Sequence, residues 1–393
     1  MRFLKNVITA ALICFTSTQA LGEESASEHF IIPTLDKLSS LSGQIDLPAS
    51  LNEKFPLVVM VPGTGLFDRN VEFGNSGTDE DLIFKSLAND LNKLGFAVLR
   101  YDYRGVRCGR KTAPVCESCK TPQERREHFI RSCLDNEVRR LVTPENTRED
   151  IRAVYRHGSS HSRVEPSKII VFGHSEGSLN LSYLLKDNLI QPKAAVFMGG
   201  LAESPASVIQ WQMIGRFTDA MMEMDSNRDG FVANEEIKAS HSRSRLNNFP
   251  LDYLLSPKND RWEQSALLQW RNSEYEVMRS DALAKADHEP FVSGGIVQAS
   301  YRWWKMFFTD NNHVIENISN YKGPVVYCNG DIDAQTDFQR QKKLVDKADK
   351  DFGLNVRIEL FTKTGHALGD DPIFGPLTIE SKNKILGIFA EFR

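Results

Sequence analysis

Residues 173–177 read Gly-His-Ser-Glu-Gly, between an apolar run at 169–172 and a helix-like run at 179–185. This pattern predicts a strand, a tight turn and a helix. The two glycines let the strand and the helix pass close together, so that the serine projects at the carboxyl end of the strand. Ser175 is therefore the candidate nucleophile.

Strand and helix patterns alternate around this turn. Upstream, residues 41–47 are expected to form a first strand, and the apolar run 57–61 leads into a Pro-Gly-Thr-Gly loop. Helical spacing follows at 83–94, and Gly95 stands where a helix often ends before the strand pattern at 96–101. Such alternation predicts a mostly parallel sheet with helices on both faces.

The alternation stops in the middle of the chain and later resumes. The middle part is helical in pattern and contains all five tryptophans. Strand patterns return at 324–328 and 356–360, and a helix is expected from about 380 to 392. We therefore expect one α/β domain with an inserted helical cap. The predicted boundaries are 21–202 and 320–393 for the two parts of the core and 203–319 for the cap.

The first 20 residues have the organisation of a secretory signal peptide. Arg2 and Lys5 precede a short apolar stretch at 7–15, and small residues lead to a cleavage site after Ala20. The apolar stretch is too short to span a bilayer, so no membrane span is expected. We expect an exported protein, periplasmic or secreted. With 25% charged residues and a net charge of −4, the composition gives no reason to expect a nucleic-acid partner.

Four of the six cysteines lie in one polar segment, an insertion at about 106–135. In an exported protein an even cluster is most simply two disulfides, and a four-cysteine zinc site is the alternative. Three pairings are possible, and the spacing does not choose among them. Cys328 lies in an apolar run and is expected to be a buried free thiol. The disulfide candidates are Cys108, Cys116, Cys119 and Cys133.

A serine nucleophile needs a base and a third group that orients the base. Asp331 and Asp333 follow the strand pattern at 324–328, and His366 follows the last strand pattern. This is the chain order serine, aspartate, histidine at the ends of successive strands.

These features together resemble the α/β-hydrolase superfamily over nearly all of the chain outside the signal and the cap. Residues 173–177 look like its nucleophile elbow, 101–105 like its Tyr-Asp-x-Arg-Gly segment, and 364–366 like its histidine loop. Residues 62–70 are similar to the oxyanion loop of the esterase-like branch related to dienelactone hydrolases and serine aminopeptidases. The resemblance implies an α/β-hydrolase fold, with the cap between its sixth and seventh strands, and a serine hydrolase activity.

The resemblance also implies individual roles. The branch places its acid in a Gly-x-x-Asp-x-x-Val pattern, which 330–336 fits with Asp333 as the acid and a threonine in place of valine. Asp331 remains the alternative. The oxyanion donors should be the backbone N–H groups of Glu176 and Thr64, with Gly65 as the alternative to Thr64. Asp102 and Arg104 are expected to pair beneath the loop rather than to bind substrate.

The loop at 63–65 also looks like the start of a dinucleotide-binding fingerprint. Asp68, however, stands where the third glycine of that fingerprint belongs, so no organic cofactor is expected.

Within the cap, residues 225–236 match the twelve-residue EF-hand loop, which binds Ca²⁺ through oxygen atoms. Gly230 allows the sharp turn, and Ala233 at the ninth position leaves that ligand to water. The alternative is a solvated acidic turn. No second loop of this kind is found, so a single structural calcium site is expected. The predicted ligands are Asp225, Asn227, Asp229, the carbonyl of Phe231, and Glu236.

The sequence thus predicts an exported serine hydrolase that cleaves carboxylic esters through an acyl-enzyme, with a calcium-stabilised cap. A peptidase or amidase is the alternative among enzymes, because the same triad cleaves amides. A non-catalytic, calcium-dependent binding protein on a hydrolase scaffold is the alternative from another class. The five tryptophans are expected either to line an apolar acyl site or to form the core of the cap.

Overall fold

The structure is a computed structural model that describes residues 26–50, 53–108, 113–247, 249–257 and 259–393. The predicted signal peptide at 1–20 lies outside the described residues. In the described part of the chain, no helix has both the length and the apolar character needed to cross a membrane.

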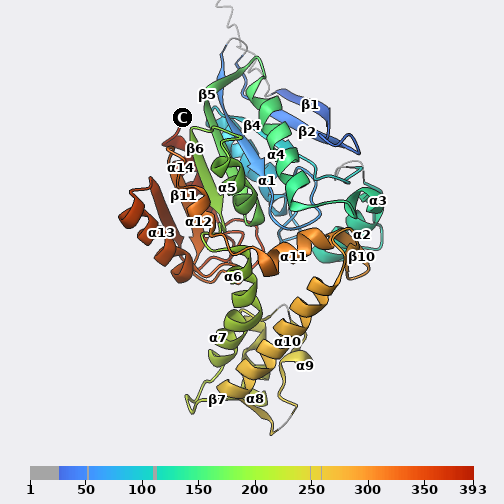
Figure 1. The fold of residues 1–393 in the computed structure, drawn as a ribbon, viewed down its shortest axis with the longest axis vertical. Coiled ribbons are helices and arrows are strands. Elements are labelled where there is room, and N and C mark those ends of the chain that lie inside the picture. Colours follow the sequence, from blue (N-terminus) through green and yellow to red (C-terminus); the bar gives the residue numbers. More distant parts are fainter. Residues whose placement is uncertain (1–25, 51–52, 109–112, 248, 258) are drawn as a thin grey trace, which may run out of the picture.

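An eight-stranded sheet forms the centre of the molecule (Figure 1). Its order is β1-β2-β4-β3-β5-β6-β11-β12, and every neighbouring pair from β4 onward is parallel. β1 and β2 pair antiparallel with each other, and β2 pairs antiparallel with β4. The strands are β1 (Ala26–Pro33), β2 (Ser40–Leu47), β3 (Phe55–Val61), β4 (Ala97–Tyr101), β5 (Val164–His174), β6 (Ala194–Met198), β11 (Val325–Gly330) and β12 (Val356–Phe361).

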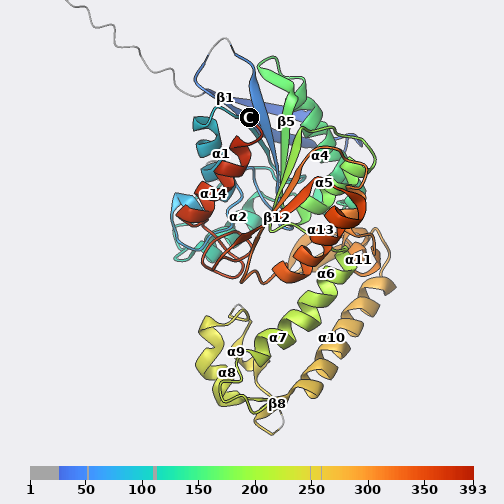
Figure 2. The ribbon, with the colours of Figure 1, turned by 90° about the vertical axis from the view of Figure 1, so that its left-hand side faces the viewer.

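Helices cover both faces of the sheet, as Figure 2 shows. Because successive side chains of a strand point to opposite faces, the wholly apolar β3 supplies both cores. Val58 and Met60 pack in one core with residues of α1 and α14, and Leu57 and Val59 pack in the other with residues of α4, α5 and α13. These helices are α1 (Ile83–Lys93), α4 (Pro144–Ser159), α5 (Glu176–Lys186), α13 (Phe338–Phe352) and α14 (Ile379–Ala390).

The expected first strand at 41–47 is the second strand of the sheet. β1 precedes it at the sheet edge, and of its eight residues only Phe30 is buried. An edge strand exposed along most of its length has no regular apolar alternation, so the sequence pattern did not reveal it.

Residues between β6 and β11 form a cap that projects below the core in Figure 1. The cap is mostly helical, as its pattern predicts, but it also contains two short antiparallel strand pairs, β7 with β8 and β9 with β10. Its elements are α6 (Pro205–Gln210), a π-helical turn (Trp211–Gly215), α7 (Arg216–Met222), β7 (Phe231–Ala233), α8 (Asn234–Ser240), α9 (Leu251–Leu254), β8 (Arg261–Glu263), α10 (Gln264–Ala284), β9 (Pro290–Ser293), β10 (Ile296–Ser300), α11 (Tyr301–Thr309) and α12 (Val314–Asn317).

The far end of the cap contains a second helix–loop–helix that the sequence analysis missed. The loop at 225–236 joins α7 to α8, and a second loop joins α9 to α10. The two loops pair through β7 and β8, with Val232 opposite Trp262. In that register, positions 1, 3, 5 and 12 of the second loop correspond to Leu255, Pro257, Asn259 and Ala266, so the second loop lacks the carboxylates of a calcium loop.

The cysteine-rich segment carries two disulfides, Cys108–Cys133 and Cys116–Cys119. The first ties the end of α2 (Pro122–Cys133) to the chain after β4, and the second closes the turn before α2. Because all four sulfurs are used, the zinc alternative fails. Cys328 is free and buried in β11, and burial raises the pKa of its thiol.

Candidate active site

Ser175 occupies a sharp turn between β5 and α5. Its backbone has φ 52° and ψ −120°, a left-handed conformation that non-glycine residues rarely adopt. The neighbouring glycines permit close packing: a Cβ atom on Gly177 would lie 2.4 Å from the carbonyl oxygen of Val61 in β3, and one on Gly173 would lie 2.8 Å from the nitrogen of Ser178. The turn therefore holds Ser175 in a strained and fixed position.

His366 and Asp333 are brought together from the loops after β12 and β11. Nδ1 of His366 lies 2.9 Å from Oδ2 of Asp333, and both residues are buried. The Asp333 carboxylate also accepts hydrogen bonds from the backbone N–H of Gln335 at 2.6 Å and of Thr336 at 2.9 Å, and from the Thr336 hydroxyl at 2.7 Å. An ionised carboxylate accepts on both oxygens, so Nδ1 of His366 carries the proton and Nε2 can act as a base.

Asp331 takes a different role in the same loop. It is exposed, and its carboxylate accepts a hydrogen bond from the backbone N–H of Thr364 at 3.2 Å. This contact links the loop after β11 to the histidine loop. Of the two candidate acids, the structure places Asp333 beside His366.

A cavity of about 310 Å³ lies over Ser175 and His366, and both residues line it together with Thr64 and Glu176. The cap contributes residues of α6, of the π-helical turn and of α11, and the core contributes the elbow, α5 and the loops after β3, β6, β11 and β12. Most of the lining is apolar. Its apolar side chains are Phe73, Leu179, Leu201, Val208, Ile209, Trp303, Trp304, Phe307, Ile373 and Phe374.

No family model matches the chain, and no curated protein matches it. Among solved structures, the chain is similar to a lipase in its open form, with 15% identity over 93% of this chain and 98% of that chain and a TM-score of 0.51. The chain has the α/β-hydrolase fold.

Two further solved structures share less with the chain. Est1E from Butyrivibrio proteoclasticus with bound ferulic acid has 13% identity over 92% of this chain and 97% of that chain, with a TM-score of 0.46. An acylaminoacyl peptidase from Pyrococcus horikoshii has 13% identity over 94% of this chain and 41% of that chain, with a TM-score of 0.44.

In the α/β-hydrolase fold, catalytic side chains follow the carboxyl ends of particular strands. Ser175 follows β5, Asp333 follows β11 and His366 follows β12. β6 is parallel to β5 and β11, so it also ends at the carboxyl edge of the sheet, and the chain enters the cap there.

The Glu176 side chain connects three parts of the site, a contact that the sequence analysis missed. Its carboxylate accepts a hydrogen bond from the Thr64 hydroxyl at 2.7 Å and another from Nε1 of Trp303 at 2.9 Å. Glu176 is buried, so these bonds are not exchanged with water. One carboxylate thus joins the elbow, the loop after β3 and helix α11 of the cap.

Replacing Glu176 with alanine is therefore expected to lower kcat by about ten- to a hundredfold, the cost of losing a charge-assisted hydrogen bond and leaving its donors unpaired. KM should change much less, because the apolar walls remain. Steady-state kinetics on a short ester measure both values.

The matched control for that experiment is Glu145→Ala. Glu145 contacts the same helix α11 through Arg302 at 2.8 Å, but this ion pair is exposed and contributes little. An unchanged kcat in Glu176→Ala, or an equal loss in Glu145→Ala, would contradict a positioning role for Glu176.

A second histidine, His174, lies close to His366. Its ring centroid is 4.9 Å from that of His366, and it lines the same cavity. Burial, and to a smaller extent the charge of His366, lowers the pKa of His174 well below its usual range. His174 therefore stays neutral near pH 7.

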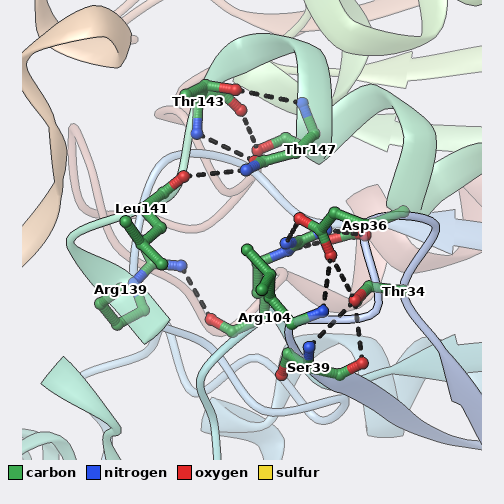
Figure 3. Close-up of polar contacts among 11 residues, drawn as sticks. Thr34, Asp36, Ser39, Arg104, Arg139, Leu141, Thr143 and Thr147 are labelled. Carbon is green, nitrogen blue, oxygen red and sulfur yellow. Dashed lines mark hydrogen bonds and ion pairs between the residues drawn. The ribbon is translucent and has the colours of Figure 1, made fainter. Parts of the chain in front are cut away.

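Asp102 and Arg104 do not pair with each other, contrary to the prediction from sequence. Asp102 accepts from Arg69, at 2.6 Å. Arg104 pairs with Asp150, at 2.6 and 2.8 Å, and with Asp36 near the end of β1, as Figure 3 shows for Asp36. Both side chains are nevertheless buried away from Ser175 and fix loops of the core.

The carboxylates of the loop at 225–236 bind backbone N–H groups of the same loop. Oδ2 of Asp225 accepts from Gly230 at 2.9 Å, and Oδ1 of Asp229 accepts from Phe231 at 2.9 Å. Glu236 accepts from Ser226 at 2.8 Å, and the hydrogen bonds from Ser226 lower its pKa. No three acidic side chains of this fully described loop have oxygens within 4.8 Å of one another.

This all-oxygen donor set suits Ca²⁺, which prefers carboxylate and carbonyl oxygens. Gly230 has φ 86° and supplies the sharp turn that such a loop needs. Binding would require Glu236 to exchange its bonds to Ser226 and to the backbone N–H of Ala233 for the metal.

Proposed function

We propose that the protein is a serine hydrolase that cleaves carboxylic esters. The observation that carries this proposal is the buried hydrogen bond between His366 and Asp333, made by a histidine that lines the same cavity as the strained Ser175.

The geometry supports a two-step acyl transfer. Oγ of Ser175 attacks the ester carbonyl while Nε2 of His366 takes its proton, and Asp333 stabilises the imidazolium that forms. The backbone N–H groups of Glu176 and Thr64 hold the oxyanion. His366 then gives the proton to the departing alcohol, and water releases the acyl group from Ser175 by the same steps.

The cavity favours esters over the peptide substrates of an aminopeptidase. An aminopeptidase needs a carboxylate that can pair with the substrate ammonium group. Among the described residues that line the cavity, Glu176 is the only carboxylate, and it is engaged by Thr64 and Trp303.

Matched esters and amides with the same acyl group test this choice. We expect turnover of the esters that is lost in Ser175→Ala, and no comparable turnover of the amides. Equal rates on amides would favour the peptidase or amidase, and no hydrolysis of either series would favour the non-catalytic binding protein.

The apolar lining also predicts a preference for longer acyl chains. Acyl groups of six or eight carbons should exceed acetyl in kcat/KM, because each buried methylene contributes about 0.8 kcal/mol. Val208→Trp, which fills the cavity, should shift the preference toward acetyl. Val277→Trp, on the exposed face of α10, is the control. A preference of the wild type for acetyl would contradict an acyl site under the cap.

We also propose that Ca²⁺ binds Asp225, Asn227, Asp229, Glu236 and the carbonyl of Phe231. The loop is connected to the triad through the cap. Helix α7, which leads into the loop, donates from Arg216 to the carbonyl of Ala334 at 2.6 Å, and Gln212 in the preceding turn donates to the carbonyl of Gln335 at 2.8 Å. These carbonyls flank the loop residues that hold Asp333, so an ordered cap supports the acid.

Calcium is therefore expected to raise the melting temperature by a few degrees. For a dissociation constant of about 10⁻⁴ M, 10 mM Ca²⁺ would stabilise the folded state by about 2.7 kcal/mol. Differential scanning calorimetry with Ca²⁺ and with chelator measures the shift.

Two variants with the same loss of charge sharpen this test. Glu236→Gln removes the proposed ligand and should abolish the shift. Glu235→Gln, next to it but exposed and paired with Lys238, should keep the shift. A wild type that does not respond would refute calcium binding, and a response that survives Glu236→Gln would place the site elsewhere.

We further propose export, to the periplasm or outside the cell, by the signal at 1–20. Two disulfides in the described residues are compatible with an oxidising compartment.

A further inference from the structure

A second, mostly apolar cavity of about 240 Å³ adjoins the active site, and α6 contributes no residue to its lining. It shares Thr64, Phe73 and Phe374 with the active-site cavity. Its other walls include Phe67 from the loop after β3 and Phe129 and Ile130 from α2. The two cavities therefore meet at Thr64, whose backbone N–H is proposed to hold the oxyanion.

Helix α2 of the cysteine-rich segment forms one wall of this cavity, and the contacts of this helix fix its position. The Cys108–Cys133 disulfide anchors the end of α2. Arg126 of the same helix donates to the carbonyl of Gly74 at 2.7 Å and to Oδ1 of Asn75 at 3.0 Å, and its guanidinium lies 5.2 Å from the ring centre of Phe374. Phe129 and Ile130 are thus held facing the loop after β3.

We infer that this cavity binds the alcohol portion of the substrate and selects alcohols with one aromatic ring. The inference rests on the proposed ester hydrolysis. A carbonyl held at Thr64 has two substituents, and two mostly apolar cavities are lined by Thr64. The cavity under the cap takes the acyl group, so the cavity against α2 takes the leaving alcohol.

Size and shape point to a single ring. An apolar cavity of about 150 Å³ accommodates benzene, so about 240 Å³ accommodates a ring with a short linker. Phe67 and Phe73 meet edge to face with ring centres 5.9 Å apart, and Phe73 and Phe374 are 5.1 Å apart. Rings in such arrangements favour a further aromatic group at their faces and edges. The selected class is therefore the aryl-methyl alcohols.

Methyl and benzyl esters of one acyl group test the inference. Methanol and benzyl alcohol have similar acidity, so the ratio of their kcat/KM values reports binding of the alcohol portion. We expect the wild type to favour the benzyl ester by about tenfold or more, from burial of the ring.

Substitutions of Ile130 should change which alcohol portions are accepted. Ile130→Trp fills the cavity and should lower the benzyl-to-methyl ratio about tenfold. Ile130→Ala enlarges the cavity and should raise the rate on a naphthylmethyl ester relative to the benzyl ester. Arg131→Trp, on the exposed side of α2, adds the same side chain outside the cavity and should keep the wild-type ratio.

The outcomes separate this inference from the function on which it rests. A wild-type benzyl-to-methyl ratio near one would overturn the inference alone. So would an unchanged benzyl-to-methyl ratio in Ile130→Trp together with an unchanged naphthylmethyl-to-benzyl ratio in Ile130→Ala, while esters are still hydrolysed. Absence of hydrolysis of every ester would overturn the proposed function, and the inference with it.

Discussion

Replacing Ser175 with alanine should lower ester hydrolysis by about four to six orders of magnitude, and His366→Ala should do the same. In the proposed mechanism Ser175 supplies the nucleophile and His366 moves its proton. Neither step has a substitute among the described residues that line the cavity. His174 does not replace His366, because its lowered pKa reflects a buried ring that resists protonation. Steady-state kinetics on a six-carbon acyl ester measure the loss.

Ser182→Ala is the matched control. Ser182 lies on the same helix α5, is fully buried, and donates to the carbonyl of Leu179 at 2.7 Å, but it does not line the cavity. Loss of the Ser182 hydroxyl should leave most of the esterase activity. Circular dichroism and melting curves should show that Ser175→Ala and His366→Ala remain folded. Substantial activity in either variant would contradict the assigned triad.

Asp333→Asn should lower kcat by about 10⁴. In the proposed mechanism Asp333 fixes the tautomer of His366 through Nδ1 and stabilises the imidazolium. An amide at that position supplies neither the charge nor the second acceptor oxygen. The same change at Asp331, two residues earlier, should leave activity near that of the wild type. Strongly reduced activity in Asp331→Asn, together with activity near that of the wild type in Asp333→Asn, would reverse the assignment of the acid.

The predictable parts of the molecule are those that local sequence encodes. The elbow at 173–177 was predictable because two glycines between an apolar strand and a helix pattern permit few other conformations. The parallel sheet followed from the alternation of strand and helix patterns. β1 was missed because an exposed edge strand needs little apolar periodicity.

The unpredictable parts depend on contacts between distant residues. The Glu176 carboxylate binds Thr64 and Trp303, which are 112 and 127 residues away in the chain. The second helix–loop–helix has no ligand pattern and is defined by the pairing of β7 with β8. The cavity against α2 exists because a disulfide places that helix beside the loop after β3. No local sequence pattern encodes these contacts between distant residues.

Labelling with a fluorophosphonate tests the central claim most directly, because this probe modifies a serine only when a neighbouring base activates it. The account predicts one adduct per chain, located on Ser175 by peptide mass spectrometry, absent in Ser175→Ala and strongly slowed in His366→Ala. A folded wild-type protein that remains unlabelled, or that carries the adduct on another residue, would contradict the account.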